Sequence, residues 1–456
     1  MVIIIGGGIS GLSAAYELAS RRVPFVLLEA SDRTGGLVRT DHVDGFTIDA
    51  GADSMLATKP AAIELCEELG LGPRLMSTTP PRTAFVHAHG RLHPLPSPSI
   101  FGIPTTASGV AEYSLLPPDA REHLARAMNA SVAAARPGRE PDDESVADFY
   151  RRHFGAATVG LIAQPLLGGI HAGDVEKLSV TTVAPRLVAA AAEGRLFQPT
   201  PVRPDAGDGL FKALRGGMGE LVSAIESRLP AGSVRVRTGA HAVSCAAPVW
   251  QVATEAGTFA ARAVIIAAPA HAAARLLAHA DAPLAALCAE VPYVSTVSVA
   301  FGWPRSSVGH PLAGSGFVVA RQHSRLRITA CTWVSSKWQD RAPPDMVLLR
   351  VFLGGALDAD AVDLPDAALV DIAANDISAV LGITGAPVLV RVERWPKAGA
   401  QHNVGHAARQ ARVGERLATL PGLFVAGSGF HSIGVPDCIA DGRAAAARAA
   451  AFVELR

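Results

Sequence analysis

The sequence has no excess of charge of either sign and few charged residues. Its 456 residues include 41 basic and 41 acidic side chains, and charged residues make up 18% of the chain, below the usual share of about 25%. Nucleic-acid binding depends on a surplus of lysine and arginine, so this neutral chain is not expected to bind nucleic acid. Hydrophobic residues make up 49%, which is too many for a disordered chain, and the length allows about three structural units.

Long apolar runs and paired cysteines are also missing. No uninterrupted apolar run approaches the roughly 18–20 residues that a membrane-spanning helix needs. The chain begins without a basic leader or a small-residue cleavage site, so we expect no signal peptide. Five scattered cysteines without a CxxC pair predict reduced thiols and a cytoplasmic location; they are Cys66, Cys245, Cys288, Cys331 and Cys438.

The first thirty residues carry a pattern typical of dinucleotide binding. Val2–Ile5 predicts a buried strand, GGGISG follows, a helical repeat comes next, and the strand PFVLLE ends in an acid, Glu29. Gly6 permits the tight turn, Gly8 admits a pyrophosphate, and Gly11 lets the helix pack against the strand. Glu29 suits the hydroxyls of an unphosphorylated ribose. The alternative is an ordinary glycine-rich turn.

The choice between FAD and NAD depends on segments further along the chain. The motif R-x-G-G-x-x-x-T at residues 33–40 resembles the second glycine motif of the flavin amine oxidase superfamily, and GFTIDAGADS at 45–54 resembles the segment beside the flavin ring. Residues 423–446 resemble the strand, glycine turn and helix that close the FAD site in that superfamily. Both ends of the chain thus carry FAD-type segments, which an NAD dehydrogenase would not need.

Three internal segments narrow the resemblance. They are LLGGIHAGDVEKLSV (Leu166 to Val180), DGLFKALRGGMGELVSAI (Asp208 to Ile225) and GVPDCIADG (Gly434 to Gly442). Together they resemble the oxygen-dependent protoporphyrinogen oxidase family, including its bacterial relatives that act on coproporphyrinogen III. The resemblance implies FAD-dependent oxidation of protoporphyrinogen IX or coproporphyrinogen III to the porphyrin in heme biosynthesis. It also implies hydride transfer to flavin, and reoxidation by dioxygen that gives hydrogen peroxide.

The implied fold is α/β, with helices and a mixed or antiparallel sheet beside a discontinuous Rossmann-like FAD-binding domain. That domain would comprise residues 1–80, 208–279 and 395–456, and the substrate-binding sheet residues 81–95 and 280–394. Residues 96–207 would form a helical insertion. Because residues 92–111 carry no Asp, Glu, Lys or Arg, this insertion either docks on a membrane or caps the substrate cavity, and both readings remain open.

The spacing of the residues themselves predicts no metal, whereas the resemblance also implies a set of FAD-lining residues. They are Gly6, Gly8, Ile9, Ser10, Gly11, Glu29, Ala30, Arg33, Gly35, Gly36, Leu37, Gly51, Ala52, Asp53, Ser54, Ala242, Val243, Trp395, Gly427, Ile433, Gly434 and Val435. Two histidine clusters, at 87–89 and 402–406, have spacings that zinc could use, but no third ligand accompanies them.

Substrate chemistry is expected at the Leu166–Val180 segment. Gly169 and Ile170 are the candidate catalytic residues, flanked by Gly168 and Ala172, and the resemblance implies that the Gly169 carbonyl accepts pyrrole N–H groups. The alternative is that the glycine pair forms only a tight turn. Rim carboxylates favour arginine; the candidates are Arg82, Arg91, Arg325 and Arg327, the last two on an expected strand, and each could instead be a surface charge.

Several positions depart from the family pattern. Arg21-Arg22 replaces a glycine before the second strand, Ser428 replaces an acid, and a proline and a tyrosine are missing after Trp395. Lys337 resembles in type the lysine that amine oxidases place near flavin, but its setting favours a strand end, and we assign it no role. The departures leave the choice of porphyrinogen open.

Two other functions remain open from the sequence. One is another flavin oxidase or desaturase on the same scaffold, acting on amines or carotenoids. The other is a redox-inactive binding protein of the same fold, which the intact glycines and Glu29 argue against. The expected partners are a porphyrinogen and dioxygen; a homodimer, a peripheral membrane contact and contacts with downstream heme-pathway enzymes are left open.

Overall fold

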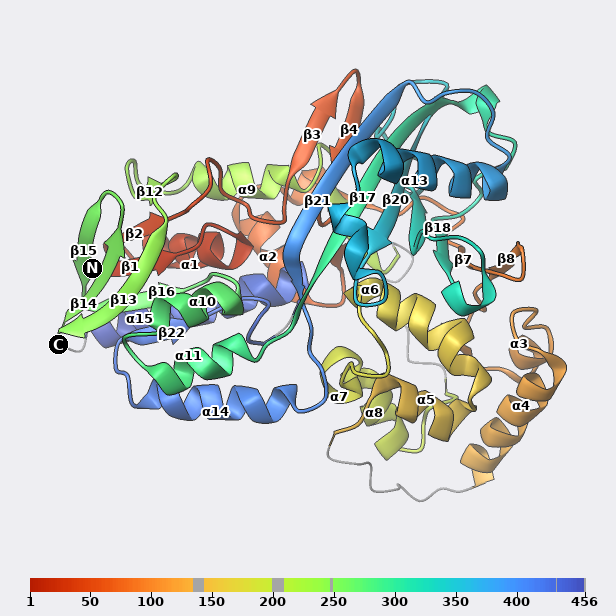
Figure 1. Cartoon of the computed structure of the whole chain (residues 1–456), viewed down its shortest axis with the longest axis horizontal. Helices are drawn as coiled ribbons and strands as arrows, with labels where there is room; N and C mark the ends of the chain where they lie inside the picture. The colour runs from red at the N-terminus through yellow and green to blue at the C-terminus, as the bar shows by residue number, and fades with distance from the viewer. Residues whose placement is uncertain (134–142, 199–208, 247–248, 432, 455–456) are drawn as a thin grey trace.

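A five-stranded parallel sheet forms the centre of one half of the molecule (Figure 1). The computed structural model describes residues 1–133, 143–198, 209–246, 249–431 and 433–454. The strand order is β12-β2-β1-β16-β22, with bounds Val234–Arg235, Phe25–Leu28, Val2–Ile5, Ala263–Ile266 and Leu423–Val425. The predicted strands at Val2–Ile5 and before Glu29 are confirmed. The sheet joins strands from both ends of the chain.

Apolar side chains cover both faces of this sheet, as a buried parallel sheet requires. On one face Val2 and Ile4 pack against α1 (Ile9–Ser20), α9 (Gly219–Glu226) and α15 (Val435–Glu454). On the other face Ile3 and Ile5 pack against an antiparallel meander and three helices. These are β13 (Ala240–Ala246), β14 (Val249–Thr254), β15 (Gly257–Ala261), α10 (Ala270–Leu277), α11 (Ala282–Ala289) and α14 (His406–Ala418).

A second, seven-stranded sheet has the order β21-β17-β20-β19-β18-β7-β8. Its bounds are Leu389–Ala400, Tyr293–Pro304, Met346–Gly354, Ala330–Trp333, Gly316–Val319, Ala84–Ala88 and Arg91–Pro94. All pairings are antiparallel except β18 with β7, so the predicted mixed sheet is confirmed. Helix α13 (Asp366–Leu381) covers one face. The expected domain boundary after residue 394 falls inside β21.

Shorter elements connect the two sheets. They are β3 (Thr40–Val43), β4 (Phe46–Asp49), β5 (Met55–Leu56), α2 (Pro60–Glu68), β6 (Leu75–Ser77) and β11 (Phe211–Leu214). The strands β5, β11 and β6 form a small sheet that brings residues far apart in the sequence together. Asp208, the first residue of the motif-bearing segment Asp208–Ile225, lies outside the described residues.

A helical unit lies against the seven-stranded sheet (Figure 1). It contains β9 (Ser99–Ile100), β10 (Ile103–Pro104), α3 (Ala107–Ala111), α4 (Pro118–Ala133), α5 (Val146–Phe154), the π-helix η2 (Val159–Gly168), α6 (Gly169–His171), α7 (Val180–Val183) and α8 (Pro185–Ala192). Within the uncharged stretch 92–111, Ile103 and Val110 are buried in the core of this unit, and Ile100 and Phe101 pack against that core. None of the helices in the described ranges is long and apolar enough to cross a bilayer.

Two local predictions are wrong. Arg325 and Arg327 precede β19 instead of lying on a strand, because the backbone N–H groups of Arg327 and Ile328 donate to Asp376 Oδ2 and not to a neighbouring strand. Lys337 ends the one-turn helix α12 (Val334–Lys337) rather than a strand. The Trp338 amide closes that turn by donating to the Val334 carbonyl at 2.9 Å.

Candidate active site

The first glycine turn presents open backbone at the start of α1. Gly8 is the N-cap of α1 and contributes no side-chain cap, and a Cβ added to Gly8 would meet no atom within 4 Å. Gly6 takes φ +106°, and a Cβ on Gly11 would lie 1.9 Å from the Gly6 carbonyl oxygen. Glycine at 6 and 11 therefore makes the turn, while the space in front of Gly8 and the amides of Ile9 and Ser10 suit an anion.

Glu29 lies at the end of β2, next to this turn. Its Oε2 accepts the Gly7 amide at 2.6 Å and its Oε1 accepts the Ser31 amide at 2.7 Å, with Ala30 between. Its remaining lone pairs can accept ribose hydroxyls. Arg22, in the Arg21-Arg22 pair before β2, takes φ +58°.

The second glycine motif packs directly on the first. The Gly35 amide donates to the Gly7 carbonyl at 2.8 Å, and a Cβ on Gly36 would lie 3.0 Å from the Gly8 Cα. Arg33 holds this turn by donating to the Gly36 carbonyl at 2.7 Å. The next residue, Leu37, keeps 45% of its surface exposed. Two glycine turns and an exposed leucine thus border one open surface.

The C-terminal segment closes on the same surface. Gly427 takes φ +112°, its amide donates to Asp441 Oδ2 at 2.6 Å, and a Cβ there would lie 3.5 Å from Ser10 Oγ. A Cβ on Gly442 would lie 2.1 Å from the Ser10 carbonyl oxygen, so α15 approaches α1 closely. Ile433, Gly434 and Val435 lead into α15.

The Ala50 carbonyl is held by three strands of the other sheet. Arg350 Nη2 on β20 donates to it at 2.8 Å, Trp395 Nε1 on β21 at 3.2 Å, and Ser298 Oγ on β17 at 3.2 Å. Arg350 also donates to the Gly51 carbonyl at 2.6 Å. Gly51 itself packs so tightly on Leu37 that a Cβ would lie 1.8 Å from the Leu37 carbonyl oxygen. The start of the GADS segment is therefore fixed in place.

Asp53 carries a buried negative charge in the same segment. Lys337 Nζ donates to its Oδ2 at 3.2 Å, and Ser54 Oγ donates to its Oδ1 at 2.7 Å, while the Ala52 amide donates to the Leu37 carbonyl. Burial acts to raise the pKa of Asp53, but Lys337 and Arg350 outweigh it and hold the pKa well below its usual value. Asp53 is therefore ionised, and Lys337 is its ion-pair partner.

These segments fit FAD. Gly8, Gly36, Leu37 and Gly427 surround one surface that additional side chains would fill, and Glu29 and the start of α1 supply the polar groups that a ribose and a pyrophosphate need. Ala242 and Val243 lie on β13, where Val243 is fully buried against β14. The chain enters β13 beside Glu29, because the Thr238 amide donates to the Glu29 carbonyl at 2.8 Å. The other predicted FAD-lining residues lie on the segments that meet here.

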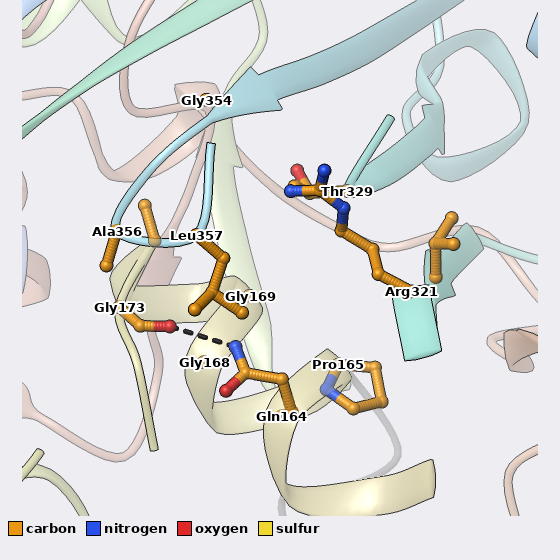
Figure 2. A pocket seen from close by; sticks show the side chains of 12 residues that line it. Gln164, Pro165, Gly168, Gly169, Gly173, Arg321, Thr329, Gly354, Ala356 and Leu357 are labelled. Atoms are coloured by element: carbon orange, nitrogen blue, oxygen red, sulfur yellow. Dashed lines mark hydrogen bonds between the residues drawn. The ribbon is translucent and has the colours of Figure 1, made fainter. Parts of the chain in front are cut away.

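The segment with the expected substrate loop is a π-helix that ends in two glycines. Gln164 on η2 donates from Nε2 to the Gly173 carbonyl at 2.9 Å and accepts the Val175 amide at 3.1 Å, which fixes the loop (Figure 2). A Cβ on Gly168 would lie 2.2 Å from Gln164 Nε2, whereas a Cβ on Gly169 would meet only Val318 Cγ1 at 4.0 Å. Close packing against Gln164 therefore requires a glycine at position 168, whereas Gly169 faces open space.

Two neighbours of Gly169 add apolar surface and fix the loop. Ile170 leaves 72% of its surface exposed, so an apolar side chain is open to solvent beside Gly169. Ala172 takes φ +48°, and its carbonyl accepts the Ala356 amide at 2.8 Å. The Ala172 amide donates to the Gly169 carbonyl at a long 3.3 Å, so that carbonyl can accept further hydrogen bonds.

A hollow of about 390 Å³, part of it open to solvent, lies between this loop and the seven-stranded sheet (Figure 2). One wall contains Gln164, Pro165, Gly168, Gly169, Ala172 and Gly173, and the other Val319, Arg321, Thr329, Gly354, Ala356 and Leu357. Arg321 was not predicted, since nothing in ARQHSRLR distinguishes it from the neighbouring arginines. Arg350 could have been noticed as the one charge within the apolar run MVLLRVFL.

None of the four predicted arginines lines this hollow. Arg82 is exposed and donates to Thr78, and Arg91 is exposed on β8. Arg325 is exposed as well, and Arg327 forms two hydrogen bonds of 3.0 Å with Asp358.

The histidine clusters serve hydrogen bonding in the described structure. His87 is buried and bonds Ser324 Oγ at 2.9 Å. His402 and His406 stack with their ring centroids 3.9 Å apart, and each Nε2 bonds a carbonyl of the 428–430 turn. Burial, aided by His402 and Lys59, lowers the pKa of His171 to about 4. Across the part of the chain that the structure describes, no three His, Cys, Asp or Glu side chains group as metal ligands.

Comparison with known proteins identifies relatives along the whole chain. The model of the family described as flavin containing amine oxidoreductase matches residues 9–450. A coproporphyrinogen III oxidase of Bacillus subtilis (strain 168) is 34% identical, covering 99% of this chain and 98% of its own. A protoporphyrinogen oxidase 2 of Arabidopsis thaliana is 24% identical over 99% and 94%. A crystal structure provisionally assigned as a protoporphyrinogen oxidase, from Exiguobacterium sp. 255-15, has a TM-score of 0.86 and 32% identity over 99% and 98%.

Proposed function

The chain belongs to the flavin containing amine oxidoreductase family, and we propose that coproporphyrinogen III is its substrate. It is an FAD-dependent porphyrinogen oxidase of heme biosynthesis. The choice of coproporphyrinogen III rests on the higher identity to the bacterial coproporphyrinogen III oxidase, 34%, than to the plant protoporphyrinogen oxidase, 24%.

The observation that carries the proposal is the position of Gly169. It combines an open Cα, a carbonyl with spare acceptor capacity and a place on the hollow between the loop and the sheet. FAD held by these segments would supply the acceptor for a hydride from a bridging carbon of the macrocycle, with dioxygen as the final acceptor and hydrogen peroxide as its product. The chain itself binds and orients the substrate.

The residues around the hollow have three tasks in this proposal. The Gly169 carbonyl accepts pyrrole N–H groups, and Ile170 contributes apolar surface to the macrocycle. Gln164 fixes the loop through its hydrogen bonds to Gly173 and Val175. His171 stays neutral at physiological pH because burial lowers its pKa to about 4, so it adds no positive charge beside the substrate.

We also propose that the helical unit covers the substrate cavity. The apolar side chains of Ile103 and Val110 are buried inside it. Among its described residues, the large hydrophobic side chain that stays exposed is Ile170, next in sequence to the hollow-lining Gly169. Protein that floats with lipid vesicles would instead support the membrane-docking reading.

Anaerobic mixing tests the function directly. FAD-loaded protein is mixed separately with coproporphyrinogen III and protoporphyrinogen IX, and the flavin absorbance is followed. We expect coproporphyrinogen III to bleach the flavin faster, with porphyrin fluorescence appearing in parallel. Faster bleaching by protoporphyrinogen IX would reverse the substrate assignment, and bleaching by neither would refute the porphyrinogen function. Putrescine serves as the control for an amine oxidase reaction.

A further inference from the structure

The sheet side of the hollow carries one positively charged side chain, Arg321. It opens the short helix η5 (Arg321–His323), directly after β18, and lies across the hollow from Gln164 and Gly169 (Figure 2). Its side chain is 26% exposed. The guanidinium extends toward Thr329 rather than away from the hollow.

The guanidinium of Arg321 is not satisfied by its neighbours. Its Nη1 is buried and has no hydrogen-bond partner within the described ranges. Its Nη2 lies 3.6 Å from Asp358 Oδ2, which is too far for a hydrogen bond. Both oxygens of Asp358 already accept hydrogen bonds of 3.0 Å from Arg327, so Asp358 is neutralised without Arg321.

Buried charged donors are normally hydrogen-bonded, because leaving one unpaired is costly. An anionic acceptor from a ligand would satisfy Nη1. Asp376, on α13, uses its Oδ2 to accept the backbone amides of Arg327 and Ile328. The hollow therefore presents a guanidinium with an unpartnered buried N–H donor, which shares the single charge of Asp358 with Arg327, beside apolar surface from Pro165, Val319 and Leu357.

We propose that Arg321 binds a rim carboxylate of the porphyrinogen and is a specificity-determining residue of this site. This inference rests on the proposed function. The planar guanidinium can pair bidentately with a propionate, while the apolar wall contacts the carbon skeleton. Arg321 and Gly169 lie on opposite walls, so one substrate molecule is held by a carboxylate on one side and by its pyrrole N–H groups on the other.

Binding of the air-stable product separates the carboxylate contact from all others. FAD-loaded wild type, Arg321→Leu, Arg321→Lys and the control Arg325→Leu are titrated with coproporphyrin III and with its tetramethyl ester, which lacks free carboxylates. For Arg321→Leu we expect the dissociation constant of the acid to rise about 10- to 100-fold, with that of the ester unchanged. Arg321→Lys should lose less affinity for the acid, since lysine keeps the positive charge but not the planar guanidinium. Arg325 is exposed and outside the hollow, so its variant should match wild type.

Two results would overturn the inference. Unchanged affinity of Arg321→Leu for the acid would show that Arg321 does not contact a carboxylate. An equal loss for acid and ester would show that the substitution disturbs packing instead. Flavin absorbance checks that each variant is folded, and Arg321→Lys replaces Arg321→Leu if the leucine variant loses FAD. If wild type is bleached by no porphyrinogen, the proposed function fails; if wild type is bleached and Arg321→Leu binds as wild type does, only the arginine inference fails.

Discussion

At the scale of single residues, Gly169 can be tested without disturbing its surroundings. A side chain there would meet only Val318 Cγ1 at 4.0 Å and would otherwise grow into the hollow. We expect Gly169→Leu to retain FAD and its melting temperature, while turnover of coproporphyrinogen III falls at least about 100-fold because the substrate is displaced. Flavin absorbance, thermal unfolding and porphyrin fluorescence measure the three properties.

Its neighbour Gly168 provides the contrasting control. A Cβ there would lie 2.2 Å from Gln164 Nε2, so Gly168→Ala should lose about 1–3 kcal/mol of stability through overpacking. Normal turnover by Gly169→Leu would show that the substrate does not occupy this side of the loop.

The pair of Lys337 and Asp53 is another residue-scale feature with a measurable contribution. Lys337 is 13% and Asp53 20% exposed at the side chain, and the two atoms Nζ and Oδ2 lie 3.2 Å apart. Lys337→Met leaves the Asp53 carboxylate buried without this partner, so we expect the free energy of unfolding to fall by about 3 kcal/mol. Urea denaturation measures the change.

An exposed lysine pair is the matched control for this substitution. Lys177 lies 3.6 Å from Asp174 and its side chain is 69% exposed, so Lys177→Met should change stability by less than about 1 kcal/mol. Equal effects of the two substitutions would mean that the buried pair contributes no more than a surface pair.

At the scale of elements, the contact between α1 and α15 depends on one glycine. A Cβ on Gly442 would lie 2.1 Å from the Ser10 carbonyl oxygen, so Gly442→Ala must push the helices apart near the start of α1. We expect lower thermal stability and weaker FAD binding. Gly414, exposed on α14 with no atom within 4 Å of an added Cβ, should gain up to about 1 kcal/mol as alanine. A Gly442→Ala protein with normal melting and FAD content would contradict this account of the helix packing.

The start of α14 makes stability depend on pH. His406 donates from Nε2 to the Phe430 carbonyl and stacks on His402, and burial together with His402 lowers the pKa of His406 to about 3. In the unfolded chain this group titrates near 6.5, so the unfolded state binds more protons between these values. Stability is therefore lost as pH falls below about 6.5, and the loss ends near pH 3.

Comparing two pH values isolates this histidine. Between pH 7.5 and 5.5 one such group lowers the free energy of unfolding by about 1.4 kcal/mol. In urea denaturation the free energy of unfolding of wild type should therefore fall by that much more than that of His406→Gln. The exposed His241, replaced in the same way, should leave the wild-type pH dependence intact. If His406→Gln shows the full wild-type loss, other groups bind the protons.

The elements also show what a sequence can predict. Val2–Ile5, the first glycine turn and the alternating strands of the second sheet were predictable because local periodicity and glycine spacing determine them. The position of Arg321 was not predictable, because three arginines lie within the segment ARQHSRLR and only tertiary packing shows which one lines the hollow. Lys337 was misplaced because its buried partner, Asp53, lies 284 residues away in the sequence.

At the scale of the whole molecule, FAD is expected to link segments from both ends of the chain, since Gly8, Gly36 and Gly427 border one surface. A ligand that binds only the folded state adds about 2.7 kcal/mol of stability at 100 times its dissociation constant. FAD should therefore raise the melting temperature of the FAD-free protein, and NAD at the same concentration should not.

The variant Gly8→Val separates FAD binding from folding. Gly8 takes φ −69° and an added Cβ meets no atom within 4 Å, so the variant without FAD should melt at the same temperature as wild type. Its side chain would occupy the space of the pyrophosphate, and the rise with FAD should disappear. If FAD still stabilises the Gly8→Val protein, the pyrophosphate does not bind in front of Gly8. If NAD stabilises the wild-type protein as much as FAD does, the site does not select FAD over NAD.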